Sequence, residues 1–315
     1  MRSQQVSRRL ARAARCGALL LVATAPAAAE TNRWWQAGPA GLLVIGNGEP
    51  QQVAAVADAL VRARQAFAPV LPTPAPGTAA PLIVFVFDDA ASAAAFPPLY
   101  EGRAVEVGGA YLPGGDLHFI TVVGSGDAQL PWRTIHHEFS HFLARQAWAD
   151  PPAWFDEGLA EYFATMARPD GAMVVEVGRP APAHLRELAR EPLLPLNDLL
   201  AVTRESPLYN EGQQRGVFYA QSWLTVHYLL AGNRERTPQL SSYLRAVAAG
   251  QPSHEAFDRA FAATPAVLEK ELADYLKRGE FPVTRVAVPA TGTGSRRDAQ
   301  PLGVADAEAW LAELL

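Results

Sequence analysis

The chain has 315 residues, 49% of them hydrophobic, with 27 basic and 32 acidic side chains and a formal net charge of −5. This composition is typical of a globular protein with enough apolar residues for a substantial core. The acidic balance argues against a nucleic-acid partner. The single cysteine, Cys16, excludes a fold built on disulfides.

The first 29 residues have the pattern of a secretory signal peptide. Five arginines within residues 2–15 precede an apolar run over 17–25, and Ala27-Ala28-Ala29 gives a cleavage site of the A-x-A type. The apolar run is about half of the ~20 residues that a membrane-spanning helix needs. We therefore expect a secreted or periplasmic protein. Cleavage after Ala29 would leave it without a stable membrane anchor. Its mature chain would have no cysteine and a net charge of about −10.

Residues 30–128 are predicted to form a mixed α/β sheet lobe. Apolar runs at 41–46 (GLLVIG) and 82–87 (LIVFVF) indicate buried strands, with a helix over 51–67 between them. Residues 108–112 and 117–123 flank Pro113-Gly114-Gly115-Asp116, which is typical of an antiparallel hairpin.

The most informative motif lies in a helix predicted over 130–148. His137-Glu138-Phe139-Ser140-His141 places two imidazoles one turn apart on one helix face, with a carboxylate beside the first. Two such histidines can bind one Zn²⁺, and Glu138 would act as the general base for a zinc-bound water. His136 points about a quarter turn away, so we interpret it as a packing or surface residue.

Tetrahedral zinc with one bound water needs a third protein ligand. A metzincin would carry Gly and His three and six residues after the second histidine, where this chain has Ala144 and Ala147. A cysteine ligand is excluded because Cys16 lies in the predicted signal peptide. A glutamate on a following helix remains.

The segment Pro152–Phe163 (PAWFDEGLAEYF) contains such a glutamate. With its Trp-x-x-Glu-Gly-x-Ala pattern after HExxH, the chain resembles the gluzincins, the thermolysin-like and aminopeptidase-like clan of zinc peptidases. The resemblance implies that Glu157 is the third zinc ligand. It also implies that Glu161, one turn later, accepts a hydrogen bond from a zinc-binding imidazole. The alternative for Glu161 is a solvated helix residue.

Residues 129–281 are predicted to hold the active-site helices and a mostly helical lobe, including a long apolar helix over 212–230. Gluzincins commonly use a tyrosine or histidine from such a lobe to stabilise the oxyanion. The resemblance of Tyr219-Ala220-Gln221-Ser222-Trp223 to bacterial peptidase MA-like proteins makes Tyr219 the first candidate and His227 the second. The alternative for both is an ordinary core position.

Two further expectations concern the substrate strand and the C-terminus. By the same resemblance, an exposed strand at 108–111 would bind the substrate backbone, with a plain hairpin strand as the alternative. It lacks the Gly-x-Met-Glu-Asn pattern of aminopeptidases, which favours an endopeptidase. Residues 282–315 are predicted to be a linker followed by a short amphipathic helix over 304–315.

The sequence thus predicts an α+β, zincin-like fold with a sheet lobe, a helical lobe and the zinc site between them. It predicts a zinc metallopeptidase acting on a peptide or protein substrate. The alternatives are an inactive peptidase-like scaffold that binds zinc, and an amidase that acts on cell-wall peptides.

Overall fold

The computed structural model describes residues 34–70, 80–97, 99–100, 103–104, 107–127, 129–148, 150–168, 173–210, 215–288 and 298–314. The predicted signal peptide, residues 1–29, lies outside them. The chain divides into two compact units. The first comprises the described residues within 1–58, 80–130 and 296–315, and the second those within 59–79 and 131–295. The prediction of a mixed α/β protein, with an N-terminal sheet followed by a helical region, is confirmed.

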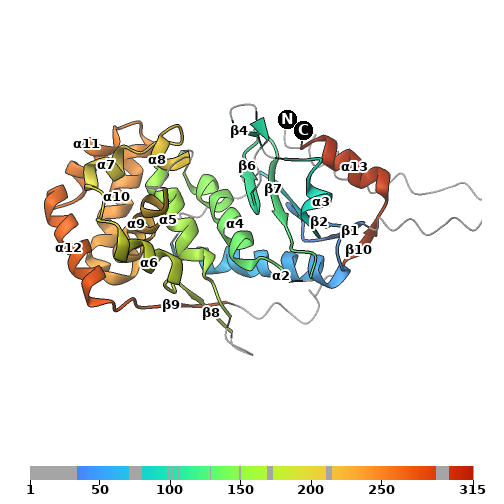
Figure 1. Ribbon diagram of the computed structural model, residues 1–315, viewed down its shortest axis with the longest axis horizontal. Helices are drawn as coiled ribbons and strands as arrows, with labels where there is room; N and C mark the ends of the chain where they lie inside the picture. The colour runs from blue at the N-terminus through green and yellow to red at the C-terminus, as the bar shows by residue number, and fades with distance from the viewer. Residues whose placement is uncertain are drawn as a thin grey trace, which may run out of the picture. The chain divides into compact units, whose positions relative to one another are not determined.

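The first unit is built on a six-stranded sheet (Figure 1). Its strand order is β10 (Gln300–Leu302), β1 (Trp34–Ala37), β2 (Leu42–Gly46), β3 (Leu82–Phe87), β7 (His118–Val123) and β6 (Gly109–Leu112). The central strands β2, β3 and β7 are parallel, and the other pairings are antiparallel. All six residues of β3 are buried, as expected for the continuous apolar run of a strand covered on both faces.

The predicted hairpin is confirmed, because β6 and β7 pair with Gly109 opposite Val122. The helix expected over 51–67 is α2 (Pro50–Phe67), of which residues up to Asp58 belong to the first unit and the rest to the second. Short elements complete this unit: α3 (Ala90–Ala93), β4 (Leu99–Tyr100) and β5 (Arg103–Ala104).

The C-terminal segment differs from the predicted linker. In the second unit, β9 (Thr284–Ala287) pairs with β8 (Val174–Val177). In the first, β10 adds a strand beside β1, and α13 (Val304–Ala312) covers one face of the sheet (Figure 1). Its Ala307 and Leu311 join the core cluster of alternate strand residues such as Ile83 and Phe85. These strands are only three or four residues long, too short for an apolar alternation to reveal them in sequence. Their partners lie more than 100 residues away along the chain.

Leu311→Ala should therefore lower the free energy of unfolding by about 2–4 kcal/mol, because the residue is buried in the sheet core. Urea denaturation of the two proteins measures the change. Glu313→Ala, on an exposed position of the same segment, should stay within about 0.5 kcal/mol of wild type. Equal stability of Leu311→Ala and wild type would contradict the structural role of α13.

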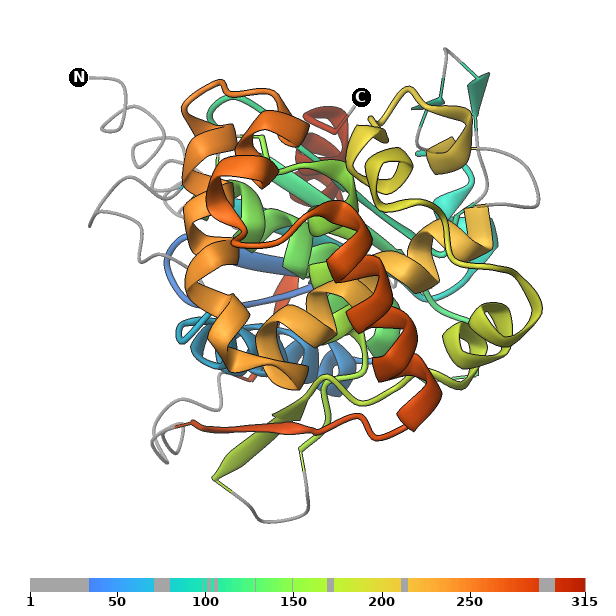
Figure 2. The same cartoon turned by 90° about the vertical axis from the view of Figure 1, so that its left-hand side faces the viewer.

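The second unit is a helical assembly (Figure 2). Its helices in chain order are α4 (Trp132–Ala147), α5 (Ala153–Ala164), α6 (Pro182–Arg190), α7 (Leu196–Ala201), α8 (Pro207–Asn210), α9 (Arg215–His227), α10 (Thr237–Ala248), α11 (Ser253–Ala260) and α12 (Pro265–Arg278). The predicted helix at 212–230 is observed as α9, which continues as a single π-helical turn over Tyr228–Gly232, followed by a 3₁₀ turn over Arg234–Arg236.

Helix α5 is the centre of this unit, because every one of its residues is buried. It packs against α4 on one side and α9 on another. Gly158 permits the second contact, since a Cβ atom there would lie only 2.3 Å from the carbonyl oxygen of Ser222 on α9. The glycine of the Trp-x-x-Glu-Gly pattern thus has a packing reason that is independent of chemistry.

Within the described part of the chain, no helix combines the length and apolarity that crossing a bilayer demands.

Candidate metal centre

Helix α4 presents His137 and His141 on one face. Their spacing of four residues brings the two rings together edge to face, and the two Nε2 atoms lie 3.1 Å apart. The helix is held by buried apolar side chains, including Ile135, Phe139 and Phe142. Both imidazoles therefore project from a helix that tertiary packing keeps in place.

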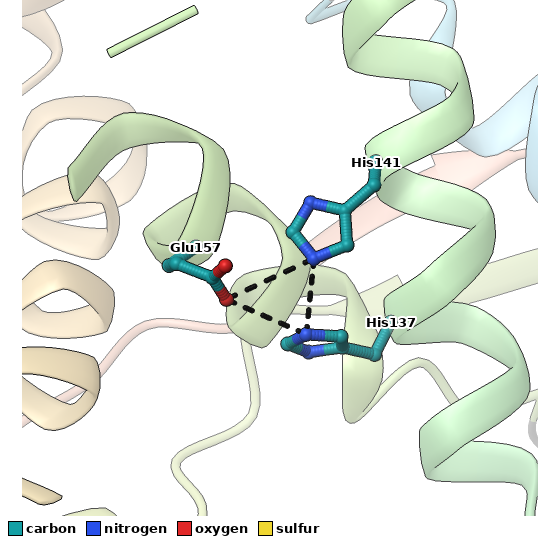
Figure 3. A group of neighbouring side chains, drawn as sticks. All are labelled: His137, His141 and Glu157. Carbon is teal, nitrogen blue, oxygen red and sulfur yellow. Dashed lines mark hydrogen bonds and ion pairs between the residues drawn. The ribbon is translucent and has the colours of Figure 1, made fainter. Parts of the chain in front are cut away.

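Glu157 on α5 completes a cluster with these histidines. Its Oε2 atom lies 3.5 Å from Nε2 of His137 and 3.8 Å from Nε2 of His141. Figure 3 shows the carboxylate pointing from its helix toward the two rings on the facing one. All three residues belong to the second, helical unit. The expected position of the site between the two lobes stays a prediction.

The three side chains fit a divalent metal ion. Ligand atoms bound tetrahedrally to zinc at about 2.0–2.2 Å stand roughly 3.3–3.5 Å from one another, close to the separations observed here. Among the described residues, nothing donates a hydrogen bond to Glu157 Oε2, although the atom is buried. A buried carboxylate oxygen without a hydrogen bond is costly, and a cation held by these three ligand atoms would offset that cost.

Each imidazole has a second carboxylate at its other nitrogen. Nδ1 of His137 lies 3.4 Å from Oε1 of Glu161, and Nδ1 of His141 lies 3.0 Å from Oδ1 of Asp156. A carboxylate on Nδ1 directs the proton there and leaves Nε2 as the metal ligand. Glu161 thus stands where the resemblance placed it, whereas Asp156 was not predicted.

The two carboxylates are themselves held by further side chains. Oε2 of Glu161 lies 2.9 Å from Nε2 of His184 and accepts a hydrogen bond from the Arg133 guanidinium. Oδ2 of Asp156 accepts a hydrogen bond from Nη2 of Arg204 at 2.8 Å. Arg133 lies on α4, one turn before His137, whereas His184 and Arg204 come from segments without a recognisable motif. Local spacing did not reveal any of these three contacts.

The charges of the site favour cations at the imidazoles. Burial alone lowers the pKa of His137 and His141, but the carboxylates beside them outweigh it, so both pKa values lie above 6.5. Burial likewise raises the pKa of Asp156 and Glu161, yet their histidine partners bring both below the usual range. Carboxylates that favour a proton on these rings also favour a metal ion there.

Glu138, the predicted general base, follows His137 on α4 and is half-buried. His136 is buried and outside the metal cluster, and its ring stacks on Trp132. Burial, helped by the charge of Arg62, lowers its pKa to about 4. The interpretation of His136 as a packing residue agrees with this position.

Two tyrosines lie at the cluster, of which the sequence analysis named one. The Tyr209 hydroxyl on α8 donates a hydrogen bond to Glu157 Oε1 at 2.5 Å. The Tyr219 ring on α9 is 6.1 Å from the Tyr209 ring, and the Arg215 guanidinium lies over it at 5.3 Å. Burial, followed by the charge of Glu157, raises the pKa of both hydroxyls, so both are protonated donors at neutral pH.

His227, the second oxyanion candidate, is a core residue. Its side chain is 0% exposed; Nε2 donates to the Gly178 carbonyl at 2.8 Å, and Nδ1 accepts from the Tyr275 hydroxyl at 2.8 Å. Both ring nitrogens are therefore engaged within the fold and neither can serve an oxyanion. Apolar periodicity could not separate these cases, because a core histidine and a catalytic one occupy similar helices.

The predicted substrate strand at 108–111 corresponds to β6, an edge strand among the described strands of the sheet. It belongs to the first unit, and the metal cluster to the second.

His227 should make the stability of the fold depend on pH. Burial lowers its pKa in the folded state to about 4, from 6.5. The unfolded chain therefore binds more protons between these values, and stability is lost as the pH falls from 6.5 toward 4. This residue would account for a loss on the order of 3 kcal/mol. Urea denaturation at pH 7 and pH 4.5 should show a smaller loss in His227→Gln than in wild type. Parallel pH profiles would contradict a buried neutral imidazole.

One comparison with known proteins identifies a related family. Residues 132–254 match a family described as "Protein of unknown function (DUF1570)". The matched segment begins with α4 and includes both histidines and Glu157. No curated protein matches the chain. The chain is thus similar, from α4 to the start of α11, to a family whose description gives no activity.

Proposed function

We propose that this protein is a zinc-dependent metallopeptidase that hydrolyses peptide bonds and is secreted or periplasmic. The observation that carries the proposal is the convergence of His137, His141 and Glu157 on one point, beside Glu138 on the same helix. Three protein ligands leave a fourth coordination position open, which is typical of catalytic rather than structural zinc sites. Glu138, which follows the ligand His137 in the chain and is the proposed general base, would have no role in a purely structural site.

In this proposal, zinc when bound polarises the scissile carbonyl and lowers the pKa of a water molecule. Glu138 would accept the proton of the attacking water and return it to the leaving amine. The carboxylates Glu161 and Asp156 hold the histidine rings by their Nδ1 atoms, so that the Nε2 atoms stay turned inward. No covalent link between protein and substrate is needed.

Tyr219 is the proposed donor to the oxyanion of the tetrahedral intermediate. Its raised pKa keeps the hydroxyl protonated, as a hydrogen-bond donor must be. Its ring lies against Tyr209, which contacts the ligand Glu157 directly. His227 is not proposed for this role, because its nitrogens are engaged elsewhere.

The chain lacks the Gly-x-Met-Glu-Asn strand that holds a free amino terminus, which favours internal cleavage over aminopeptidase activity. The acidic mature chain carries no basic feature that would draw it to nucleic acid. The proposed partner is therefore a peptide or protein substrate.

Glu138→Gln should retain zinc and lose hydrolysis of a casein-type substrate by about 10²–10⁴-fold, because the amide keeps the shape of the side chain but cannot accept the proton. Zinc content and turnover are measured on the same preparations. Glu49→Gln, at an exposed position of the first unit, serves as the control and should match wild type in both. Full activity of Glu138→Gln would show that Glu138 is not the base.

Activity of wild type on cell-wall peptides but not on casein would move the substrate to the amidase class. Activity on neither, with zinc bound, would support the inactive scaffold.

A further inference from the structure

Tyr209 holds the ligand Glu157 by the carboxylate oxygen that does not face the histidines. Its hydroxyl donates to Oε1 at 2.5 Å, whereas Oε2 faces the two imidazoles and accepts no hydrogen bond from the described residues. The hydrogen bond to an ionised carboxylate is of the strong, charge-assisted kind. One oxygen of Glu157 is thereby occupied, and the other is left for a metal ion.

The Tyr209 ring is fixed by the elements around it. It packs against Phe218 and Tyr219 of α9, at centroid distances of 6.0 and 6.1 Å. Its backbone NH donates to the Ser206 carbonyl at 3.0 Å, and Pro207 begins the short helix α8. The hydroxyl is therefore delivered by a folded turn rather than by a free side chain.

Arg204, five residues earlier in the chain, contacts Asp156, which in turn lies beside the second ligand, His141. Its guanidinium donates to Asp156 Oδ2 at 2.8 Å, and Oδ1 of the same aspartate lies 3.0 Å from Nδ1 of His141. The guanidinium also donates to Asp150 Oδ1 at 2.7 Å and to the Pro151 carbonyl at 3.2 Å. The segment around Arg204 is thus hydrogen-bonded to Asp150 and Pro151, which precede α5.

The turn between these two residues is internally bonded. The Thr203 NH donates to Ser206 Oγ at 2.9 Å, and the Ser206 NH donates to the Thr203 carbonyl at 3.1 Å. One short segment therefore carries both contacts, one reaching Glu157 directly and the other reaching His141 through Asp156.

We propose that residues 203–209, hereafter the clamp segment, position two of the three metal ligands. Tyr209 restricts Glu157 to binding through Oε2 alone, and Arg204 fixes the His141 ring through Asp156. Both are positioning residues, since neither is placed at the reacting atoms. The inference rests on the metal site of the proposed function, and it holds whatever the substrate is.

The test measures metal binding instead of turnover. Zinc affinity is determined by chelator competition for wild type, Tyr209→Phe, Arg204→Gln and the double variant. Tyr228→Phe is the matched control for loss of one hydroxyl, because that hydroxyl donates to Glu271 and not to a residue of the metal cluster. Outer contacts of this kind are worth about 10-fold or more in metal affinity. Each single variant should therefore bind zinc about 10-fold more weakly, and the double variant about 100-fold more weakly, because the two arms act on different ligands. Tyr228→Phe should bind zinc as wild type does.

A spectroscopic measurement separates positioning from general destabilisation. With Co²⁺ in place of zinc, the visible absorption of Tyr209→Phe should weaken relative to wild type, as expected when Glu157 binds through both oxygens and the coordination number rises. Arg204→Gln, which leaves Glu157 in place, tests the clamp segment independently if Tyr209→Phe does not fold.

Wild-type zinc affinity and an unchanged Co²⁺ spectrum in Tyr209→Phe, or wild-type affinity in Arg204→Gln, would overturn the clamp while leaving the proposed function intact. Failure of wild type to bind metal would overturn both.

Discussion

The account of the helical unit depends on the cluster formed by His137, His141 and Glu157, whose ligand atoms point toward one another. Two imidazole nitrogens and a carboxylate oxygen lie within 4.8 Å of one another, and the oxygen has no hydrogen bond among the described residues. Helices bring such groups together only if something offsets their desolvation. A divalent cation would do so, and the surrounding carboxylates of Glu161 and Asp156 would add to its attraction. The close packing of α5 on α9 at Gly158 holds the third ligand in place.

Much of the cluster could be predicted from sequence because it is encoded in short-range spacing. The separation of His137 and His141 by four residues fixes their relation on any α-helix. Glu157 needed a second motif, Trp-x-x-Glu-Gly, whose glycine has a visible packing role. The apolar runs of β2, β3 and β7 predicted a sheet for the same reason, since a buried strand is locally apolar.

Features that depend on contacts between residues far apart in the chain could not be predicted from the sequence. Asp156 lies in the quoted motif, but its partner Arg204 is 48 residues away, and Tyr209 is 52 residues from Glu157. The spacing of residues along the chain does not indicate that such distant residues form a pair. The C-terminal strands are short and polar, and only their pairing with β1 and β8 reveals them. His227 shows the converse, because a residue type common in catalysis serves here as a hydrogen-bonded core side chain.

The central claim is that His137, His141 and Glu157 bind one zinc ion. Elemental analysis of the purified protein, dialysed against a weak chelator and run beside Glu157→Ala, tests it most directly. The account predicts about one zinc per chain in wild type and a marked loss in the variant, since one of the three protein ligands in a catalytic-type site is removed. Absence of zinc in wild type, or equal zinc content in both proteins, would contradict it.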